Sequence, residues 1–275
     1  MCLVLIAYNP AAHHPLVVAA NRDEFYARPT RAAQYWEDQP AVLAGRDLSA
    51  GGTWLGVHRN GRFATVTNYA DQTQGHDAIA APPPAPAART ADGMAANDHP
   101  AQFPQSRGEL AERFLSGSAD ADSFARALHP PAYRGFNLLL FDGETLVYTS
   151  NRGHHRTLAP GIYGLANAEL GASWPKVIRG ERALRSALAE MPDPDRLLDL
   201  LADRTIPPDH ELPARGRPLE LERSVAPCFI AGAEYGTRAS TAVIIGRDRV
   251  TFAEQEYFAF GRAGRRALFE FDIER

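Results

Sequence analysis

Short apolar runs separated by turn residues recur along the chain and predict β-strands. The run from 2 to 8 is almost wholly apolar, which is typical of a strand buried on both faces. A second such run, 16–20, follows a turn that begins at Asn9-Pro10, so the two runs are expected to form a hairpin. Asn60-Gly61 lies between two further apolar runs and is a strong hairpin signal. The predicted strands span 2–8, 16–20, 53–58, 62–69, 136–141, 145–149, 161–165, 228–231, 240–245, 250–255 and 267–273.

The middle of the chain shows helical periodicity instead. A long helix is predicted over about 174–190, with Ser173 as its N-cap and a proline tolerated in its first turn. Its buried stripe would consist of Val177, Ile178, Leu184 and Leu188. Shorter helices are predicted at 110–115, at 121–128 after a cap at Asp120 or Asp122, and from a cap at Asp193 to 201, whereas 26–48 and 207–221 are expected to be irregular.

Strand groups at both ends of the chain enclose this helical middle, and the sequence has no internal repeat and no clean boundary. We therefore expect one α+β domain over residues 1–275, with helices packed on sheet faces. The stretch of about 71–105 differs, because its run Ala81-Pro82-Pro83-Pro84-Ala85-Pro86 has low complexity and cannot pack a core. This Pro/Ala-rich stretch is expected to be an exposed, mobile insertion.

The composition is ordinary for a globular protein and narrows the choice of partners. Of the 275 residues, 45% are hydrophobic and 23% are charged, and the net charge of -4 gives no reason to expect nucleic-acid or anionic-membrane binding. No apolar run reaches the roughly 18 residues of a transmembrane helix, and the start lacks the basic segment of a signal peptide. Two cysteines make no disulfide framework, so we expect a cytoplasmic protein without an integral membrane segment.

Cys2 directly follows the initiator methionine and is the first candidate for chemistry. A small second residue favours removal of Met1, which would leave one residue with both a thiol and a free α-amine. This pair suits N-terminal nucleophile chemistry, in which the amine acts as the base for its own side chain. The alternative is that Cys2 is a small apolar residue that opens a buried strand.

The nine histidines raise the question of a metal or haem site. The adjacent pairs His13-His14 and His154-His155 would point to opposite faces of a strand, and neither matches a metal-binding spacing. The chain also has no Cys-x-x-Cys-His run for haem attachment. We therefore expect no bound metal and no resident cofactor.

Several short motifs together resemble the NRDE family, which includes the transport and Golgi organisation protein 2. The tetrapeptide that names the family stands at Asn21-Arg22-Asp23-Glu24, and Met1-Cys2 opens the chain. The remaining matches occur in the family's order over nearly the whole chain: Gly51-Gly52-Thr53-Trp54-Leu55-Gly56, Thr67-Asn68-Tyr69, Ser106-Arg107-Gly108-Glu109, Gly135-Phe136-Asn137-Leu138, Tyr163-Gly164-Leu165-Ala166-Asn167 and Tyr235-Gly236-Thr237-Arg238. The family is similar to the N-terminal nucleophile hydrolases and, more distantly, to the bile-acid and penicillin V amidases among them.

This resemblance implies a fold and a set of catalytic residues. The fold would be a four-layer αββα sandwich, in which two antiparallel sheets face each other with helices outside. Cys2 would be the nucleophile, Asp23 would hold its amine and Arg238 would lie near the thiol. Asn68 and Asn167 would supply amide contacts near the oxyanion. The structural alternatives are an ion pair at a strand end for Asp23, backbone satisfaction for the two asparagines and a surface charge for Arg238.

The resemblance also implies residues that line the substrate site, with one departure from the amidases. Those enzymes have an arginine just before the asparagine-x-aspartate run, where this chain has Ala20, and Arg22 could act from the neighbouring position. Together with Arg22, the substrate-binding residues would be Asn21, Trp54 and Tyr69.

Two functions fit this resemblance. The first is a cysteine N-terminal nucleophile hydrolase that acts on a non-peptide C–N bond of a small acylated molecule through an acyl-enzyme on Cys2. The second is a non-catalytic carrier or chaperone for haem or for a lipid-like or acyl-coenzyme A ligand, because members of the family have been linked to haem trafficking and lipid handling. A scaffold protein, with the Pro/Ala-rich stretch as a docking segment, is a third and weaker alternative. Retention of Met1 would exclude the self-activated mechanism, since Cys2 would then lack a free amine.

Overall fold

A computed structural model describes residues 2–70 and 105–274 of the chain. The predicted mobile insertion lies outside these residues except for Gln105. The strands are β1 (Leu3–Tyr8), β2 (Leu16–Phe25), β3 (Thr30–Tyr35), β4 (Val42–Asp47), β5 (Leu55–His58), β6 (Phe63–Asn68), β7 (Phe136–Phe141), β8 (Leu146–Ser150), β9 (Arg156–Thr157), β10 (Gly161–Leu165), β11 (Tyr235–Ile245), β12 (Arg249–Phe258) and β13 (Arg262–Asp272). The helices are α1 (Gly108–Ser116), α2 (Ala121–Arg126), α3 (Pro175–Ala187), α4 (Pro194–Asp199) and α5 (Leu219–Val225).

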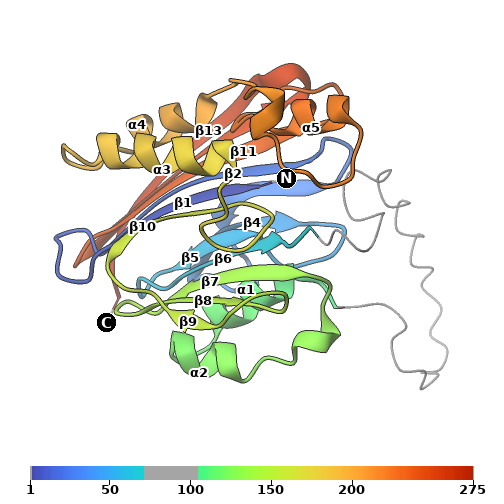
Figure 1. Ribbon diagram of the computed structural model, residues 1–275. Helices are drawn as coiled ribbons and strands as arrows, with labels where there is room; N and C mark the ends of the chain where they lie inside the picture. Colours follow the sequence, from blue (N-terminus) through green and yellow to red (C-terminus); the bar gives the residue numbers. More distant parts are fainter. Residues whose placement is uncertain (1, 71–104, 275) are drawn as a thin grey trace, which may run out of the picture.

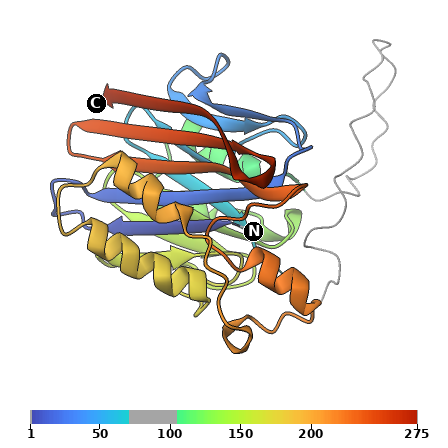
Figure 2. The ribbon, with the colours of Figure 1, turned by 90° about the horizontal axis from the view of Figure 1, so that it is seen from above.

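The strands form two antiparallel sheets that face each other, as Figure 1 shows. One sheet has the order β10-β1-β2-β11-β12-β13 and the other the order β3-β4-β5-β6-β7-β8-β9. Helices α3 and α4 cover the outer face of the first sheet (Figure 2), and α1 and α2 lie on the outer side of the second. The α+β prediction is therefore confirmed.

The buried apolar side chains form three clusters that match this arrangement. The largest lies between the sheets and combines residues such as Val18 from β2 and Phe141 from β7. A second cluster joins α1 and α2 to the outer face of the β3–β9 sheet and includes the fully buried Phe114. The third joins α3 and α4 to the outer face of the other sheet. The central strands of both sheets therefore alternate between an inner, sheet-facing side and an outer, helix-facing side.

The strand β2 is longer than predicted and contains the whole NRDE tetrapeptide. It continues to Phe25 because β11 pairs along its full length, from Ile245 with Leu16 to Tyr235 with Phe25. Alternation then places Arg22 on the inner side with Ala20, and Asp23 on the outer side. The tetrapeptide is thus a strand segment whose side chains point alternately to the inner and the outer face of the sheet.

Two predictions about irregular and extended segments were wrong. The stretch 26–48 was expected to be irregular because polar residues interrupt its apolar ones. It contains β3 and β4, which form a hairpin at one edge of the second sheet. The predicted strand at 228–231 is absent from both sheets, and Ala231 forms only an isolated bridge with Gly236. An apolar run alone did not distinguish a buried connection from a strand.

The long helix was predicted with the wrong cap and with one wrong residue in its buried stripe, whereas Val177 and Leu184 are buried as predicted. Trp174, not Ser173, occupies the N-cap position of α3, and its side chain makes no capping hydrogen bond. Ile178 is 46% exposed, whereas Lys176 is buried. By contrast, Asp193 caps α4 as predicted, because its carboxylate accepts hydrogen bonds from two backbone N–H groups.

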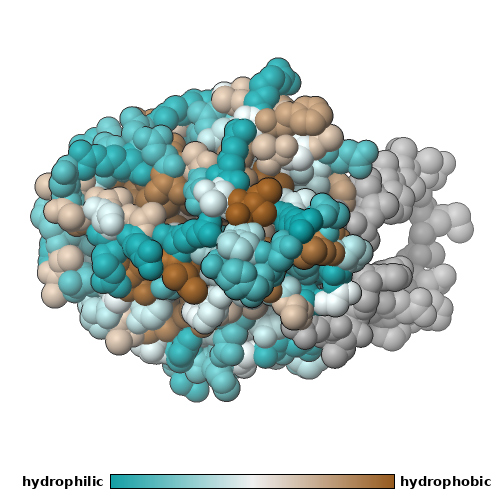
Figure 3. Space-filling view, turned by 45° about the horizontal axis from the view of Figure 1, so that its top comes forward, coloured by the Kyte–Doolittle hydropathy of each residue, from teal (hydrophilic) through white to brown (hydrophobic). Residues whose placement is uncertain are grey.

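On the face in Figure 3, hydrophobic residues lie in separate patches among polar ones. Among residues 2–70 and 105–274, no helix has both the length and the apolar character needed to cross a bilayer.

Candidate active site

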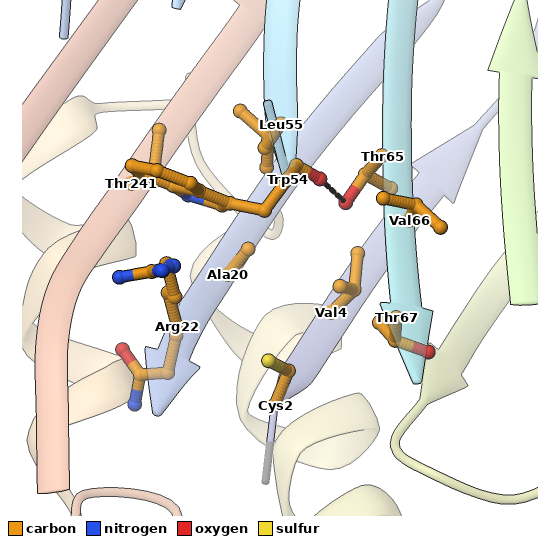
Figure 4. Close-up of a pocket in the computed structure, with 11 residues that line it drawn as sticks. Cys2, Val4, Ala20, Arg22, Trp54, Leu55, Thr65, Val66, Thr67 and Thr241 are labelled. Carbon is orange, nitrogen blue, oxygen red and sulfur yellow. Dashed lines mark hydrogen bonds between the residues drawn. The ribbon is translucent and has the colours of Figure 1, made fainter. Parts of the chain in front are cut away.

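Cys2 lies at the start of β1, where its side chain faces the space between the sheets. Leu3 pairs with Asn21 on β2, so Cys2 stands beside Arg22 on the same inner side. Figure 4 shows this arrangement, with Thr67 on the facing sheet. A small pocket of about 260 Å³, mouth included, opens here. Its described lining consists of Cys2, Val4, Ala20, Asn21, Arg22, Trp54, Leu55, Thr65, Val66, Thr67 and Thr241.

Asn167 holds the backbone nitrogen of Cys2. The Cys2 N–H donates to Asn167 Oδ1 at 2.8 Å, and Asn167 Nδ2 donates to the carbonyl of Asn68 at 2.8 Å. These two bonds fix the orientation of the amide, because its oxygen can only accept and its nitrogen can only donate. The Asn68 side chain itself is exposed at the end of β6. Asn167 therefore positions the nitrogen of Cys2, and Asn68 anchors Asn167 through its backbone.

A buried polar network fixes the loop that carries Asn167. The Thr67 hydroxyl donates to the carbonyl of Ala166 at 2.9 Å, and Asn137 Nδ2 donates to that of Ala168 at 2.9 Å. The Tyr148 hydroxyl donates in turn to Asn137 Oδ1 at 2.8 Å. Because these groups are buried, losing one bond would leave a polar partner unsatisfied.

Arg22 is a buried cation in the pocket wall. Its guanidinium stacks over the ring of Trp54 at 4.2 Å from the centroid and donates to Thr30 Oγ1 at 3.3 Å. The carboxylates of Glu24 and Asp47 lie 3.9 and 3.7 Å from its Nη2. Burial lowers the pKa of Arg22, and these carboxylates and Cys2 oppose that effect. The stacking holds the positively charged guanidinium in the pocket wall that also contains Cys2.

Asp23 points to the opposite face of β2 and meets a residue that the sequence patterns did not single out. Its Oδ1 accepts a hydrogen bond from the Thr237 hydroxyl at 2.8 Å, and its Oδ2 lies 4.0 Å from Lys176 Nζ. Both Asp23 and Lys176 are 4% exposed. Burial raises the pKa of Asp23 and lowers that of Lys176, and the charge of each partner counteracts the shift of the other.

One sequence signal could have identified Lys176. Lysine and arginine together number 29, yet Lys176 is the single lysine of the chain. The apolar stripe predicted for this helix does not include Lys176.

Three other predicted site residues make hydrogen bonds to groups outside the pocket lining. Arg238 Nη1 donates to the carbonyls of Phe25, Tyr26 and Arg28 at 2.9 to 3.1 Å, which fixes the turn after β2. The amide of Asn21 bonds to Leu201, Cys228 and Ser240 on the outer side of β2. Tyr69 is half-buried, and its N–H donates to Gly135. Of these three residues, only Asn21 belongs to the described pocket lining.

The two thiols differ sharply in environment. Cys228 is buried, its thiol donates to the carbonyl of Leu201 at 3.3 Å, and burial raises the pKa of Cys228 to about 12. Cys2 is partly exposed at the pocket. We therefore expect iodoacetamide at pH 7.5 to alkylate Cys2 in the native protein and both thiols after denaturation, because the thiolate is the nucleophile. Peptide mapping checks this, and comparable native labelling of Cys228 would contradict it.

Glu254 on β12 is a buried carboxyl next to the pocket wall. Its Oε1 accepts from the Ala33 N–H at 2.6 Å and its Oε2 from the hydroxyl of Thr241, a pocket residue, at 3.4 Å. Burial raises the pKa of Glu254 from 4.5 to about 7. Its contribution to stability is thus fully present below pH 4.5 and is lost as the pH rises through 7.

A Glu254→Gln variant tests this pH dependence. Glutamine keeps the acceptor for Ala33 but cannot ionise, so its free energy of unfolding at pH 8 should exceed that of the wild type by about 3 kcal/mol. Below pH 4.5 the two proteins should be nearly equal. Urea denaturation at a series of pH values measures both, and parallel stability curves would refute the assignment.

A metal site is not evident at this pocket. Within the part of the chain that the structure describes, no group of three or more His, Cys, Asp or Glu side chains is arranged to hold a metal ion.

The sequence profile of the family described as Transport and Golgi organisation 2 matches residues 1–259. The chain belongs to this family. It is 33% identical to the Transport and Golgi organization protein 2 homolog of Bos taurus, a match that covers 93% of this chain and 92% of that protein. The homolog of Homo sapiens is 30% identical with the same coverage.

The fold of this member of the Transport and Golgi organisation 2 family is similar to that of an N-terminal nucleophile hydrolase. A mutant conjugated bile acid hydrolase from Clostridium perfringens superposes with a TM-score of 0.50, over 99% of this chain and 92% of that one. The sequence identity is 8%, so the likeness concerns the fold alone.

Proposed function

We propose that this protein is a cysteine N-terminal nucleophile hydrolase, built on a four-layer αββα sandwich, that cleaves a non-peptide C–N bond of a small acylated molecule. The observation that carries the proposal is the placement of Cys2. Its side chain lines the inter-sheet pocket while Asn167 holds its backbone nitrogen at 2.8 Å. A structural cysteine would need neither feature.

The proposed reaction begins once Met1 is removed and the nitrogen of Cys2 becomes a free amine. That amine takes the proton of the thiol, and the sulfur attacks the carbonyl carbon of the amide. The amine then gives its proton to the leaving nitrogen as the C–N bond breaks, which leaves a thioester on Cys2. The same amine takes a proton from water as the oxygen adds to the thioester, and it returns that proton to the sulfur as the C–S bond breaks and the acid is released. The charge of Arg22 stabilises the sulfur anion, because a cation beside a thiol favours the thiolate.

The pocket favours a small acyl group. The space at its described part is about 260 Å³ with the open mouth included, so the enclosed cavity is smaller than this. Apolar Val4, Ala20 and Leu55 contribute to its wall with Trp54, which suits a hydrocarbon segment next to the carbonyl. Our candidate donor to the oxyanion is the amide of Asn68, whose backbone carbonyl binds Asn167.

The carrier alternative differs from hydrolysis in what it demands of Cys2. A carrier for haem or a lipid-like ligand needs a cavity that takes up the ligand, but it needs no activated thiol. Haem titration with a tight Soret shift, together with an unreactive Cys2, would favour it.

An electrophilic probe tests the proposal. Protein of verified intact mass without Met1 is treated with an alkyne-tagged β-lactone, and the modified peptide is mapped. We expect acylation at Cys2, its loss in Cys2→Ala and its persistence in the matched control Cys228→Ala. Failure of the wild type to react, despite a free Cys2 amine, would rule out the proposed nucleophile.

A further inference from the structure

Lysine occurs once in this chain, at Lys176 on α3, on the helix-facing side of the sheet that carries Cys2. Of the 29 basic residues, 28 are arginine, so the chain otherwise supplies positive charge exclusively as guanidinium. Lys176 is 4% exposed, although lysine is rarely buried without a partner. Burying an ammonium costs several kcal/mol, as a rough guide, unless a nearby charge offsets it. Some requirement of this buried position must therefore favour lysine over arginine.

The contacts of Lys176 indicate that this requirement is an ionic interaction with Asp23. Lys176 Nζ lies 4.0 Å from Asp23 Oδ2 and donates to the carbonyl of Val225 at 3.4 Å. Asp23 is also fixed by the hydroxyl of Thr237. Since Leu3 pairs with Asn21, the backbone just before Leu3 runs beside Arg22 and Asp23. The nitrogen of Cys2 belongs to that backbone.

The packing of α3 explains why a compact ammonium suits the site. A Cβ on Gly180 would lie 2.7 Å from Leu5, and one on Gly164 would lie 2.6 Å from Val177. These two glycines let the first turns of α3 approach β1 and β10 closely, which confines the Lys176 side chain. An ammonium is a small point charge, whereas a guanidinium is a planar fork that needs more room.

We propose that Lys176 is a positioning residue: its ammonium keeps the Asp23 carboxylate ionised and fixed beside the amino terminus of Cys2, and its charge favours the uncharged, proton-accepting form of that amine. This inference rests on the proposed hydrolase function and adds to it a cation on the helix side of the sheet. Lys176 does not belong to the described pocket lining, so it acts through Asp23 and not on the substrate.

The electrostatic environment agrees with this role. Burial lowers the pKa of Lys176, while Asp23, Cys228 and Cys2 raise it and Arg215 lowers it. Arg215 pairs with Glu222 on α5, which compensates its charge. Asp23 is thus the largest opposing influence on the lysine, and the two residues form one electrostatic unit.

The single lysine permits a direct measurement. In protein labelled with ¹⁵N at the lysine side chain, one Nζ signal is expected, and it belongs to Lys176. We expect this group to be protonated at pH 7, and its titration midpoint to fall by more than about one pH unit in Asp23→Asn, since the stabilising charge is lost. A neutral lysine at pH 7, or the same midpoint in both proteins, would overturn the proposal. This readout does not depend on activity.

A second measurement connects the pair to Cys2. In Met1-free protein, Lys176→Met should slow alkylation of Cys2 by iodoacetamide roughly tenfold at pH 7 and shift the midpoint of the pH–rate profile upward by about one unit. The control Arg179→Met removes a cation from the exposed side of the same helix, where Glu211 is 3.9 Å away, and should leave the profile unchanged. An unchanged profile in Lys176→Met would refute the inference. If wild-type Cys2 does not react at all, the hydrolase proposal fails, while the lysine signal still decides whether the pair exists.

Discussion

Protein that retains a residue before Cys2 should acylate about 10²–10⁴-fold more slowly than protein with a free Cys2 amine, which is the usual range for loss of a general base. The reason is that an amide nitrogen cannot accept the thiol proton. The comparison uses a protease-cleavable leader in front of Cys2, with the rate of β-lactone acylation measured by intact mass before and after cleavage.

The cleaved protein is the matched control for that experiment, because only the leader differs. Recovery of the rate on cleavage supports the amine as the base. Equal rates before and after cleavage would mean that another group deprotonates the thiol.

Asp23→Asn should lose both reactivity and stability. We expect acylation of Cys2 to fall about 10²-fold or more, because the amine loses the carboxylate that orients it. We also expect the free energy of unfolding to drop by about 3–5 kcal/mol, since the substitution leaves Lys176 buried without its ionic partner. Acylation kinetics and urea denaturation measure the two effects separately.

The control for this variant is Asp38→Asn, which removes one partner of an exposed ion pair with Arg46. Exposed pairs contribute little to stability, so neither measurement should change. Full reactivity in folded Asp23→Asn would exclude Asp23 from the site.

The sequence was sufficient for the parts of the fold in which local patterns and tertiary structure agree. The apolar run before Tyr8, the Asn60-Gly61 hairpin and the Asp193 cap each depend on neighbours in sequence, and each was predicted. The β3–β4 hairpin was missed because an edge of a sheet tolerates polar residues on both faces. The full length of β2 was missed because it depends on pairing with β11, more than 200 positions away.

The candidate site could be predicted only in part for the same reason. Motif resemblance indicated Cys2, Asp23 and Asn167, but not that Asn167 binds the nitrogen of Cys2. Arg238 carries a charge that suggests a role at the thiol, yet its Nη1 donates to three backbone carbonyls. Lys176 escaped notice because helical periodicity weighs apolar residues and not the rarity of a residue type.

Rapid-quench mass spectrometry of Met1-free protein, mixed with a panel of short-chain N-acyl amides, tests the central claim most directly. The account predicts a transient mass increase equal to the acyl group, located on Cys2, which decays as the free acid appears. If no acyl adduct forms on Cys2 with any amide, while intact mass shows that Met1 is gone, the hydrolytic account is contradicted.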